Sequence, residues 1–381
     1  MANMKKSKIK RIIKSTSENG VSYIIGLSGL PFPINTIKEF IKIKAESSPA
    51  SFVDWKLSWH KIYSQELGNC VGLTYNGERI SLPQVLIFDN TKRKFPLSKI
   101  KFQLISDFFE IRNDIQSLTE DSFEKLLAYL RKKRRYSNEQ NLRLVNFIEE
   151  YEGAVLIVQP VEYKYFVHTN LVLDVKSKGK EQTLREYLHC DGKLEDFEES
   201  PLANHLGINI LLFTADGSLI MQKRSKEVAF RTKELCSAAS GAISLTDVST
   251  ELTLEDMPKL REAFEEIGIS KKDILSDKIF FLGITRELIR GGKPEMFFFG
   301  KTNLSEKQTK EKWKDAKDKW ESKKLIFFNF GQIAHKELIN STEQHKFLSK
   351  IDEFLDKYID MSSIPLLTSV ALFVQYRMLG N

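Results

Sequence analysis

The stretch Leu260-Arg-Glu-Ala-Phe-Glu-Glu-Ile-Gly-Ile269 decides how the second half of this chain is interpreted. Wound as an α-helix, it carries four apolar residues at the i, i+3, i+4, i+7 spacing of a core-facing helix: Leu260, Ala263, Phe264 and Ile267. Three glutamates fall on the opposite side: Glu262, Glu265 and Glu266. Glycine reaches the left-handed conformation that commonly ends a helix, so we expect the helix to end at Gly268.

The three carboxylates on one helix face repel one another unless positive charge lies among them. A hard divalent cation with oxygen ligands is one physical reason to keep them together, and a solvated acidic face is the alternative. The order of the residues favours the metal. Arg261-Glu-x-x-Glu-Glu-x-Gly268 followed by an aliphatic residue resembles the second half of the signature of the Nudix hydrolase superfamily.

The resemblance implies a loop and helix between two sheets, which hold Mg²⁺ or Mn²⁺ against the phosphates of a nucleoside diphosphate linked to another group. By position, it makes Arg261 the residue that orients the carboxylates. Glu265 and Glu266 would bind the metal, and Glu262 would be a ligand or the base that activates water. Divalent ions suit this chemistry because they neutralise charge on non-bridging oxygens and lower the pKa of bound water.

The first half of the signature departs from the family pattern. Counted back from Arg261, the family's glycine would fall at Asp247 and its glutamate at Thr253. Gly241 is the nearest suitable glycine, and choosing it makes the loop six residues longer than the pattern. Glu251 or Glu255 would then supply the missing acid.

Charged residues at other strand ends are further candidates for the site. Four cations could clamp phosphates through charge-assisted hydrogen bonds: Lys223, Arg224, Arg290 and Lys293. Glu287 and Glu295 are candidates for a base near the phosphates. For Glu287 and Glu295 we favour a solvated acid at a strand end, because unpaired carboxylates usually stay in water.

The length of 381 residues suits two domains, and the composition shifts at residues 191–201, an acidic and turn-rich stretch that we interpret as a linker. Residues 202–381 follow the element order of a Nudix domain, so the resemblance implies an α/β/α sandwich with a mixed sheet. Helices are predicted over 305–324, 342–358 and 363–379. Residues 1–190 read as an α+β domain that resembles no family we recognise.

Within the first domain, Asn76-Gly77 predicts a β-hairpin turn. Helices are predicted over 99–117, 119–133 and 137–151, and one or two strands over 155–175. The basic run Arg131–Arg135 is a possible nucleic-acid or phosphate-binding patch. We favour a solvated helix end, because no interleaved aromatic residues accompany the run.

The overall composition is that of a globular protein, with 41% apolar and 29% charged residues. The net charge of +7 suits phosphate-bearing or polyanionic partners without establishing either. Three widely spaced cysteines make no disulfide framework and predict a reducing compartment. The most apolar run, residues 364–374, is too short to span a bilayer, so we expect a cytoplasmic protein without a membrane segment.

These observations predict a metal-dependent hydrolase that cleaves a diphosphate linkage in a small nucleotide substrate. The alternative from another class is a regulatory or sensor protein that uses a Nudix fold to bind a nucleotide ligand without hydrolysis, since fold alone does not fix function. Nucleic-acid binding through Arg131–Arg135 is a third possibility. The sequence indicates neither the identity of the substrate nor the oligomeric state.

Overall fold

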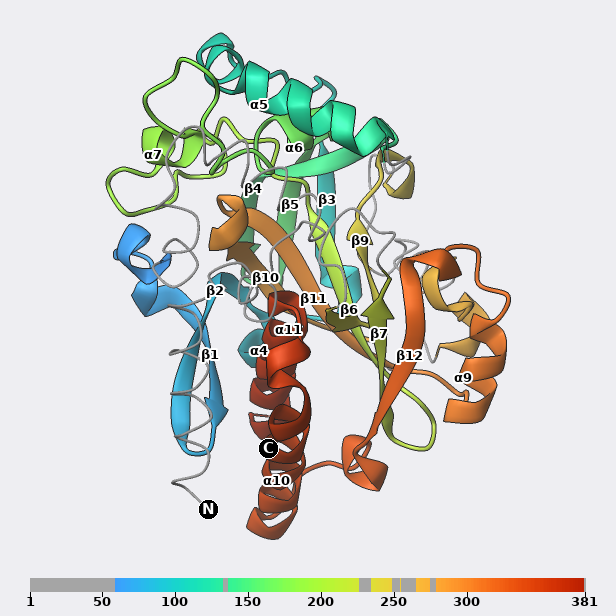
Figure 1. The fold of residues 1–381 in the computed structure, drawn as a ribbon. Helices are drawn as coiled ribbons and strands as arrows, with labels where there is room; N and C mark the ends of the chain where they lie inside the picture. The colour runs from blue at the N-terminus through green and yellow to red at the C-terminus, as the bar shows by residue number, and fades with distance from the viewer. Residues whose placement is uncertain are drawn as a thin grey trace, which may run out of the picture.

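A computed structural model describes residues 59–132, 136–225, 234–248, 254, 265–274 and 279–379. Within these residues the chain forms a nine-stranded mixed sheet and a smaller three-stranded sheet, with helices packed around them (Figure 1). The structure therefore combines α and β elements, as the sequence predicts. None of the helices in the described ranges is long and apolar enough to cross a membrane.

The large sheet has the strand order β1-β2-β10-β11-β6-β7-β12, while β9 pairs with β6 and β8 pairs with β7. Its strands are β1 (Cys70–Tyr75), β2 (Glu78–Asp89), β6 (Gly207–Phe213), β7 (Ser218–Arg224), β8 (Leu235–Ser237), β9 (Ala239–Ala242), β10 (Phe280–Glu287), β11 (Lys293–Lys301) and β12 (Ser322–Asn329). The pair β11–β6 is parallel, and the other pairs in this sheet are antiparallel.

The small sheet consists of β3 (Ile100–Leu104), β5 (Gly153–Glu162) and β4 (Gln140–Glu150), in that order. It shares one hydrophobic core with the large sheet. Leu156 of β5 and Ile210 of β6 both belong to this core, as does Ile267 at the end of the acidic helix. The small sheet and the helical residues 265–267 therefore pack on the same face of the large sheet.

Two helices cover the opposite face, α10 (Ser341–Tyr358) and α11 (Ile364–Met378). Strand β6 contributes buried side chains to both faces of the sheet. Leu211 and Phe213 pack with the helices, whereas Ile210 and Leu212 pack toward the small sheet. A strand buried on both faces carries apolar residues on both of them, which explains the apolar run Ile210–Phe213 in β6.

The remaining helices are short or lie at the periphery of the two sheets. They are α4 (Asn90–Arg93), α5 (Asn113–Lys132), α6 (Tyr163–His168), α7 (Leu184–Leu188) and α9 (Glu306–Trp313). The 3-10 turns are η1 (Leu67–Asn69), η2 (Leu97–Lys99), η3 (Leu245–Asp247), η4 (Lys271–Asp273), η6 (Leu288–Arg290), η7 (Lys319–Glu321), η8 (Gly331–Ala334) and η9 (Ile359–Met361).

The predicted hairpin at Asn76–Gly77 is confirmed, because these residues join β1 to β2 with φ angles of 51° and 77°. The predicted helices over 99–117 and 137–151 are wrong where β3 and β4 run. Ile100 and Phe102 of β3 are buried while Lys101 between them is exposed, which is the period of a strand. The helix predicted over 305–324 is shorter, since α9 ends at Trp313.

The strands predicted over 155–175 are confirmed only in their first part. Strand β5 ends at Glu162, and α6 together with turns occupies the rest of this range. The helix predicted over 119–133 lies within α5 as far as Lys132. The helices predicted at 342–358 and 363–379 are confirmed as α10 and α11.

The large sheet takes strands from both sides of the linker predicted at residues 191–201. Strand β2 pairs with β10, and their register matches Phe88 with Ile284 and Val85 with Arg286. The division into a domain of residues 1–190 and one of residues 202–381 stays a prediction, but the hairpin β1–β2 extends the sheet of the second half.

Candidate functional site

The C-terminal end of the acidic helix has the expected geometry. Glu265, Glu266 and Ile267 are helical, and Gly268 follows with a φ of 73°. A Cβ atom on Gly268 would lie 2.5 Å from the backbone oxygen of Lys312. Both the left-handed backbone and the close approach of α9 therefore require glycine at this position. Four other predicted site residues lie outside the described residues: Glu251, Glu255, Arg261 and Glu262.

The two described glutamates of the motif point to different partners. Glu266 is 4% exposed, and its Oε2 accepts a hydrogen bond from the side-chain amide of Gln222 on β7. The same amide donates to the backbone oxygen of Ala238 at 2.8 Å, which ties the helix to the turn between β8 and β9. Glu265 lies nearer the surface, where its Oε1 is 2.8 Å from the Lys317 ammonium.

The carboxylates of Glu265 and Glu266 are hard oxygen donors of the type that Mg²⁺ and Mn²⁺ take. In the described part of the chain, no three His, Cys, Asp or Glu side chains come together as a possible set of metal ligands. Glu262, the third acid of the motif, is outside that part. The donor chemistry fits the predicted ion, and the metal site stays a prediction.

A cavity lies where β6 and β7 diverge. The two strands pair only at Leu212–Ile220 and Phe213–Leu219, while residues 207–210 of β6 pair with β9 instead. Five residues predicted from the sequence line this cavity: Arg224, Gly241, Arg290, Lys293 and Glu295. Lys223 is not among the lining residues of the described chain, because successive side chains of a strand such as β7 point to opposite faces.

The charges at the cavity form one buried network. Glu295 Oε1 accepts from Arg290 Nη2 at 2.9 Å and from Lys293 Nζ at 2.6 Å, and its Oε2 accepts from Asn209 Nδ2 at 2.7 Å. Arg290 also donates through Nε to Glu287 Oε2 at 2.9 Å. The side chains of Glu287 and Glu295 are 0% and 5% exposed. The interpretation of these two glutamates as solvated surface acids is therefore wrong, because buried carboxylates need such partners.

Gly207 provides the space that this network occupies. A Cβ atom at Gly207 would lie 2.2 Å from Glu295 Oε2 and 2.4 Å from Lys293 Nζ. The ion pair is therefore packed directly against the backbone of β6. Any side chain at position 207 would push Glu295 and Lys293 away from their present positions.

Cations outnumber carboxylates among the residues that line the cavity. Arg224, Arg290 and Lys293 are present with Glu295 as the only Asp or Glu among the described lining residues. Arg224 reaches Glu321 at 3.3 Å. Burial lowers the pKa of the Lys293 ammonium to about 8, against the opposing effect of Glu295. Each of these three cations also contacts a carboxylate, that of Glu287, Glu295 or Glu321, so an anionic ligand would share the cations with these partners.

An aromatic wall, which the sequence analysis does not predict, completes the cavity. Tyr163 and Phe166 come from α6, and His205 precedes β6. The His205 ring stacks on Phe166 with centroids 4.7 Å apart. Burial lowers the pKa of His205 to about 3, so its imidazole is neutral at physiological pH. Tyr163 precedes the first strand of the second half by more than 40 residues, so no local motif links it to the cations.

The loop between β10 and β11 carries Arg290, and side chains from the first half hold its backbone. Arg185 of α7 donates to the backbone oxygens of Leu288 at 2.9 Å and Ile289 at 2.6 Å. It also forms two hydrogen bonds to Asp174, at 2.7 and 3.0 Å. Asn170 donates to the backbone oxygen of Arg290 at 2.9 Å.

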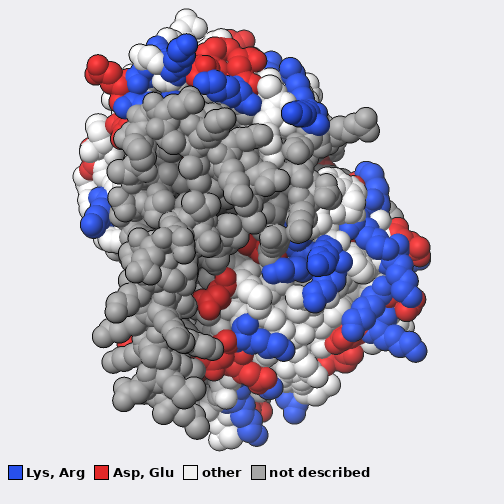
Figure 2. Space-filling model, viewed as in Figure 1, with Lys and Arg blue, Asp and Glu red and all other residues white. Residues whose placement is uncertain are grey.

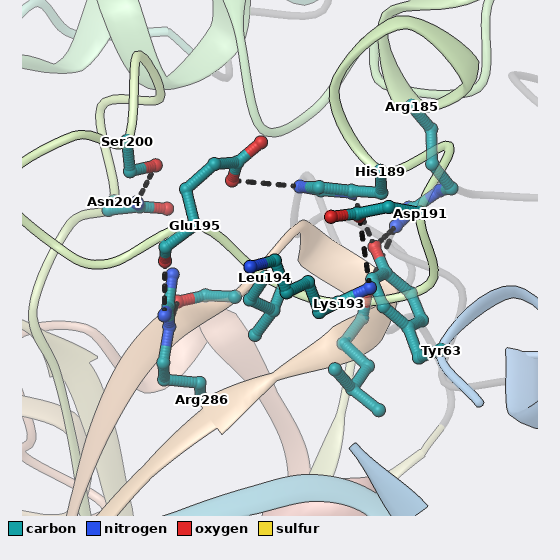
Figure 3. Close-up of polar contacts among 12 residues, drawn as sticks. Tyr63, Arg185, His189, Asp191, Lys193, Leu194, Glu195, Ser200, Asn204 and Arg286 are labelled. Atoms are coloured by element: carbon teal, nitrogen blue, oxygen red, sulfur yellow. Dashed lines mark hydrogen bonds and ion pairs between the residues drawn. The ribbon is translucent and has the colours of Figure 1, made fainter. Parts of the chain in front are cut away.

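Figure 3 shows the polar cluster next to this loop, in which Arg185 donates a hydrogen bond to the Tyr63 hydroxyl. The same hydroxyl lies 2.7 Å from Nδ1 of His189, and the other ring nitrogen of His189 lies 3.2 Å from Glu195. Arg286 of β10 closes the cluster by donating to the backbone oxygens of Glu195 at 2.6 Å and Gly292 at 3.2 Å. The cationic loop is thus fixed by residues on both sides of the predicted linker.

The basic run predicted at Arg131–Arg135 is described only at Arg131 and at Lys132, its neighbour in α5. The Arg131 guanidinium lies 5.4 Å from the ring centroid of Tyr136. In Figure 2, basic and acidic side chains are mixed on the visible face at the top of the molecule, where Figure 1 places α5. Nucleic-acid binding stays a prediction, and the mixed charge gives it little support on this face.

No protein-family model matches this chain, and a comparison with curated proteins found no match.

Proposed function

We propose that this protein is a divalent-metal-dependent hydrolase that cleaves a diphosphate linkage in a nucleoside diphosphate derivative, with a Nudix-like domain in residues 202–381. One observation carries the proposal. The cavity that brings Arg224, Arg290 and Lys293 together is also lined by Gly241, the glycine assigned to the motif loop. The cations and Gly241 are predicted from separate parts of the sequence, and their shared place in the cavity supports the proposal.

The acidic helix is attached to the wall of the same cavity. Glu266 is hydrogen-bonded to Gln222, and Gln222 pairs across the sheet with Cys236, which lines the cavity. Arg224 follows Gln222 by two positions, so the two side chains lie on the same face of β7. The carboxylate of Glu266 and the guanidinium of Arg224 therefore lie on the same side of β7.

The cations have the chemistry that a diphosphate requires. Guanidinium and ammonium groups form short, charge-assisted hydrogen bonds to phosphate oxygens, and Arg290 and Lys293 are already oriented by Glu295. Glu262, Glu265 and Glu266 would hold the metal. When bound, the metal would supply charge neutralisation at the phosphates and a water of lowered pKa.

A nucleotide-binding protein without hydrolysis is the second candidate. Both described motif carboxylates already have partners in the fold, Glu266 with Gln222 and Glu265 with Lys317. A binding module that uses this helix only to shape its cavity would need the same contacts.

Product release from a panel of nucleoside diphosphate derivatives with Mg²⁺ or Mn²⁺ tests the proposal. We expect metal-dependent turnover by the wild type and its loss in Glu265→Gln/Glu266→Gln. Glu152→Gln is the matched control, because it neutralises a glutamate in an exposed ion pair with Lys99. A wild type that binds nucleotides but turns over none would establish the binding protein instead. A wild type that neither binds nor cleaves any of them would refute both functions.

A further inference from the structure

We infer that Tyr163, contributed by the first half of the chain, is a specificity-determining residue that contacts the nucleoside end of the ligand. The inference rests on the proposed function and names the part of the substrate that the aromatic wall recognises. It also gives the first half a role in the site itself.

Tyr163 is the most exposed member of the aromatic wall. Phe166 and His205 are 4% and 1% exposed, whereas Tyr163 is half-buried and lines the same cavity as Arg290. No described residue forms a hydrogen bond with the Tyr163 hydroxyl. Tyr163 therefore lines the space beside the cations.

Three neighbouring rings fix the orientation of Tyr163. Its ring centroid lies 6.0 Å from Phe166, 5.9 Å from His205 and 6.0 Å from Tyr136, each in a tilted arrangement. A ring held in this way loses little conformational entropy when a planar group stacks on it. This preorganisation is what a recognition contact requires.

The chemistry of the two walls indicates which part of the ligand meets Tyr163. Burial raises the pKa of its hydroxyl, so Tyr163 is a neutral donor and acceptor and not a phenolate. A neutral aromatic ring has little affinity for phosphate compared with the cations Arg224, Arg290 and Lys293. Stacking on a nucleobase is the stronger use of such a ring, worth about 1–3 kcal/mol per base. The diphosphate then lies at the cations and the base at Tyr163.

Binding of two kinds of probe to the full-length protein tests this assignment. Inorganic pyrophosphate reports on the cations alone, and ADP, GDP, CDP and UDP report on the cations together with the base. With Mg²⁺ present, we expect the wild type to bind at least one nucleoside diphosphate more tightly than pyrophosphate. Tyr163→Ala should weaken the binding of that nucleotide about five- to 160-fold, the range that corresponds to the loss of one stacking contact. It should change pyrophosphate affinity less than about twofold.

Two further variants keep the test decisive. Tyr163→Phe retains the ring and should keep most of the affinity, which separates a ring contact from a loss of folding. Tyr151→Ala removes a tyrosine that is 97% exposed and should change neither affinity. Equal weakening of nucleotide and pyrophosphate by Tyr163→Ala, or no weakening at all, would overturn the inference. So would a wild type that binds pyrophosphate as tightly as every nucleotide, although the proposed function would then stand. A wild type that binds neither probe would refute the proposed function as well.

Discussion

The Arg185 guanidinium donates a hydrogen bond of 2.6 Å to the backbone carbonyl of Ile289, a residue 104 positions further along the chain. Arg185 is 3% exposed, and Ile289 directly precedes Arg290, which lines the cavity. The position of Arg290, and with it a positive charge at the cavity, therefore depends on a residue of the first half of the chain. The two halves of the chain cooperate at the site even though the sequence suggests two separate domains.

We expect Arg185→Leu to lower the free energy of unfolding by about 3 kcal/mol, because it leaves Asp174 and the loop carbonyls without their buried partner. Urea denaturation measures the change. Arg112→Leu is the control, since the Arg112–Asp114 ion pair is exposed and should contribute less than about 1 kcal/mol. Equal losses in the two variants would show that Arg185 has no special role in holding the loop.

Gly268→Ala should lower the free energy of unfolding by more than about 1 kcal/mol, because alanine is strained at a φ of 73° and its Cβ would meet the Lys312 carbonyl. Thermal or urea unfolding provides the measurement. Gly68→Ala is a matched control, because a Cβ atom at Gly68 would have no heavy atom within 4 Å. If both variants unfolded like the wild type, the helix would not need to end at Gly268.

Local features of the site could be predicted from the sequence because each depends on a few neighbouring residues. Gly268 follows a stretch with the apolar spacing of an amphipathic helix, and Arg290 and Lys293 flank the glycine pair of a tight turn. These short-range patterns predict where each residue lies along the chain. Together with the strand order, they also predict which of these residues lie near one another. The Arg290–Glu295 ion pair required the structure, because the sequence offers Arg290 as a phosphate clamp and Glu295 as a base or a solvated acid, and not as buried partners.

The aromatic wall and the frame of the loop could not be predicted, because they depend on contacts between distant segments. Tyr163 meets Arg290 only after the small sheet has packed on the large one. The wrong helix over β3 has a different cause. The residues Ile100-Lys-Phe-Gln-Leu104 alternate between apolar and polar, which is the period of a strand and not of a helix. The alternating burial that defines β3 arises from packing against the second sheet.

Lys293 should make ligand binding depend on pH. Burial lowers its pKa to about 8, so the ammonium loses its charge as the pH rises through that value. We expect the affinity for the nucleoside diphosphate that binds best to fall about tenfold between about pH 7.5 and 9.5, as measured by calorimetry. Lys293→Arg keeps its charge throughout and should bind without this fall.

The fall in affinity would not come from unfolding. A lysine in an unfolded chain has a pKa of about 10.4, so between about pH 8 and that value the unfolded state binds this proton more tightly than the folded state. The contribution of Lys293 to the free energy of unfolding therefore rises with pH across the same window. An affinity that stays constant in the wild type, or that falls equally in Lys293→Arg, would show that the charge of Lys293 does not contribute to holding the ligand.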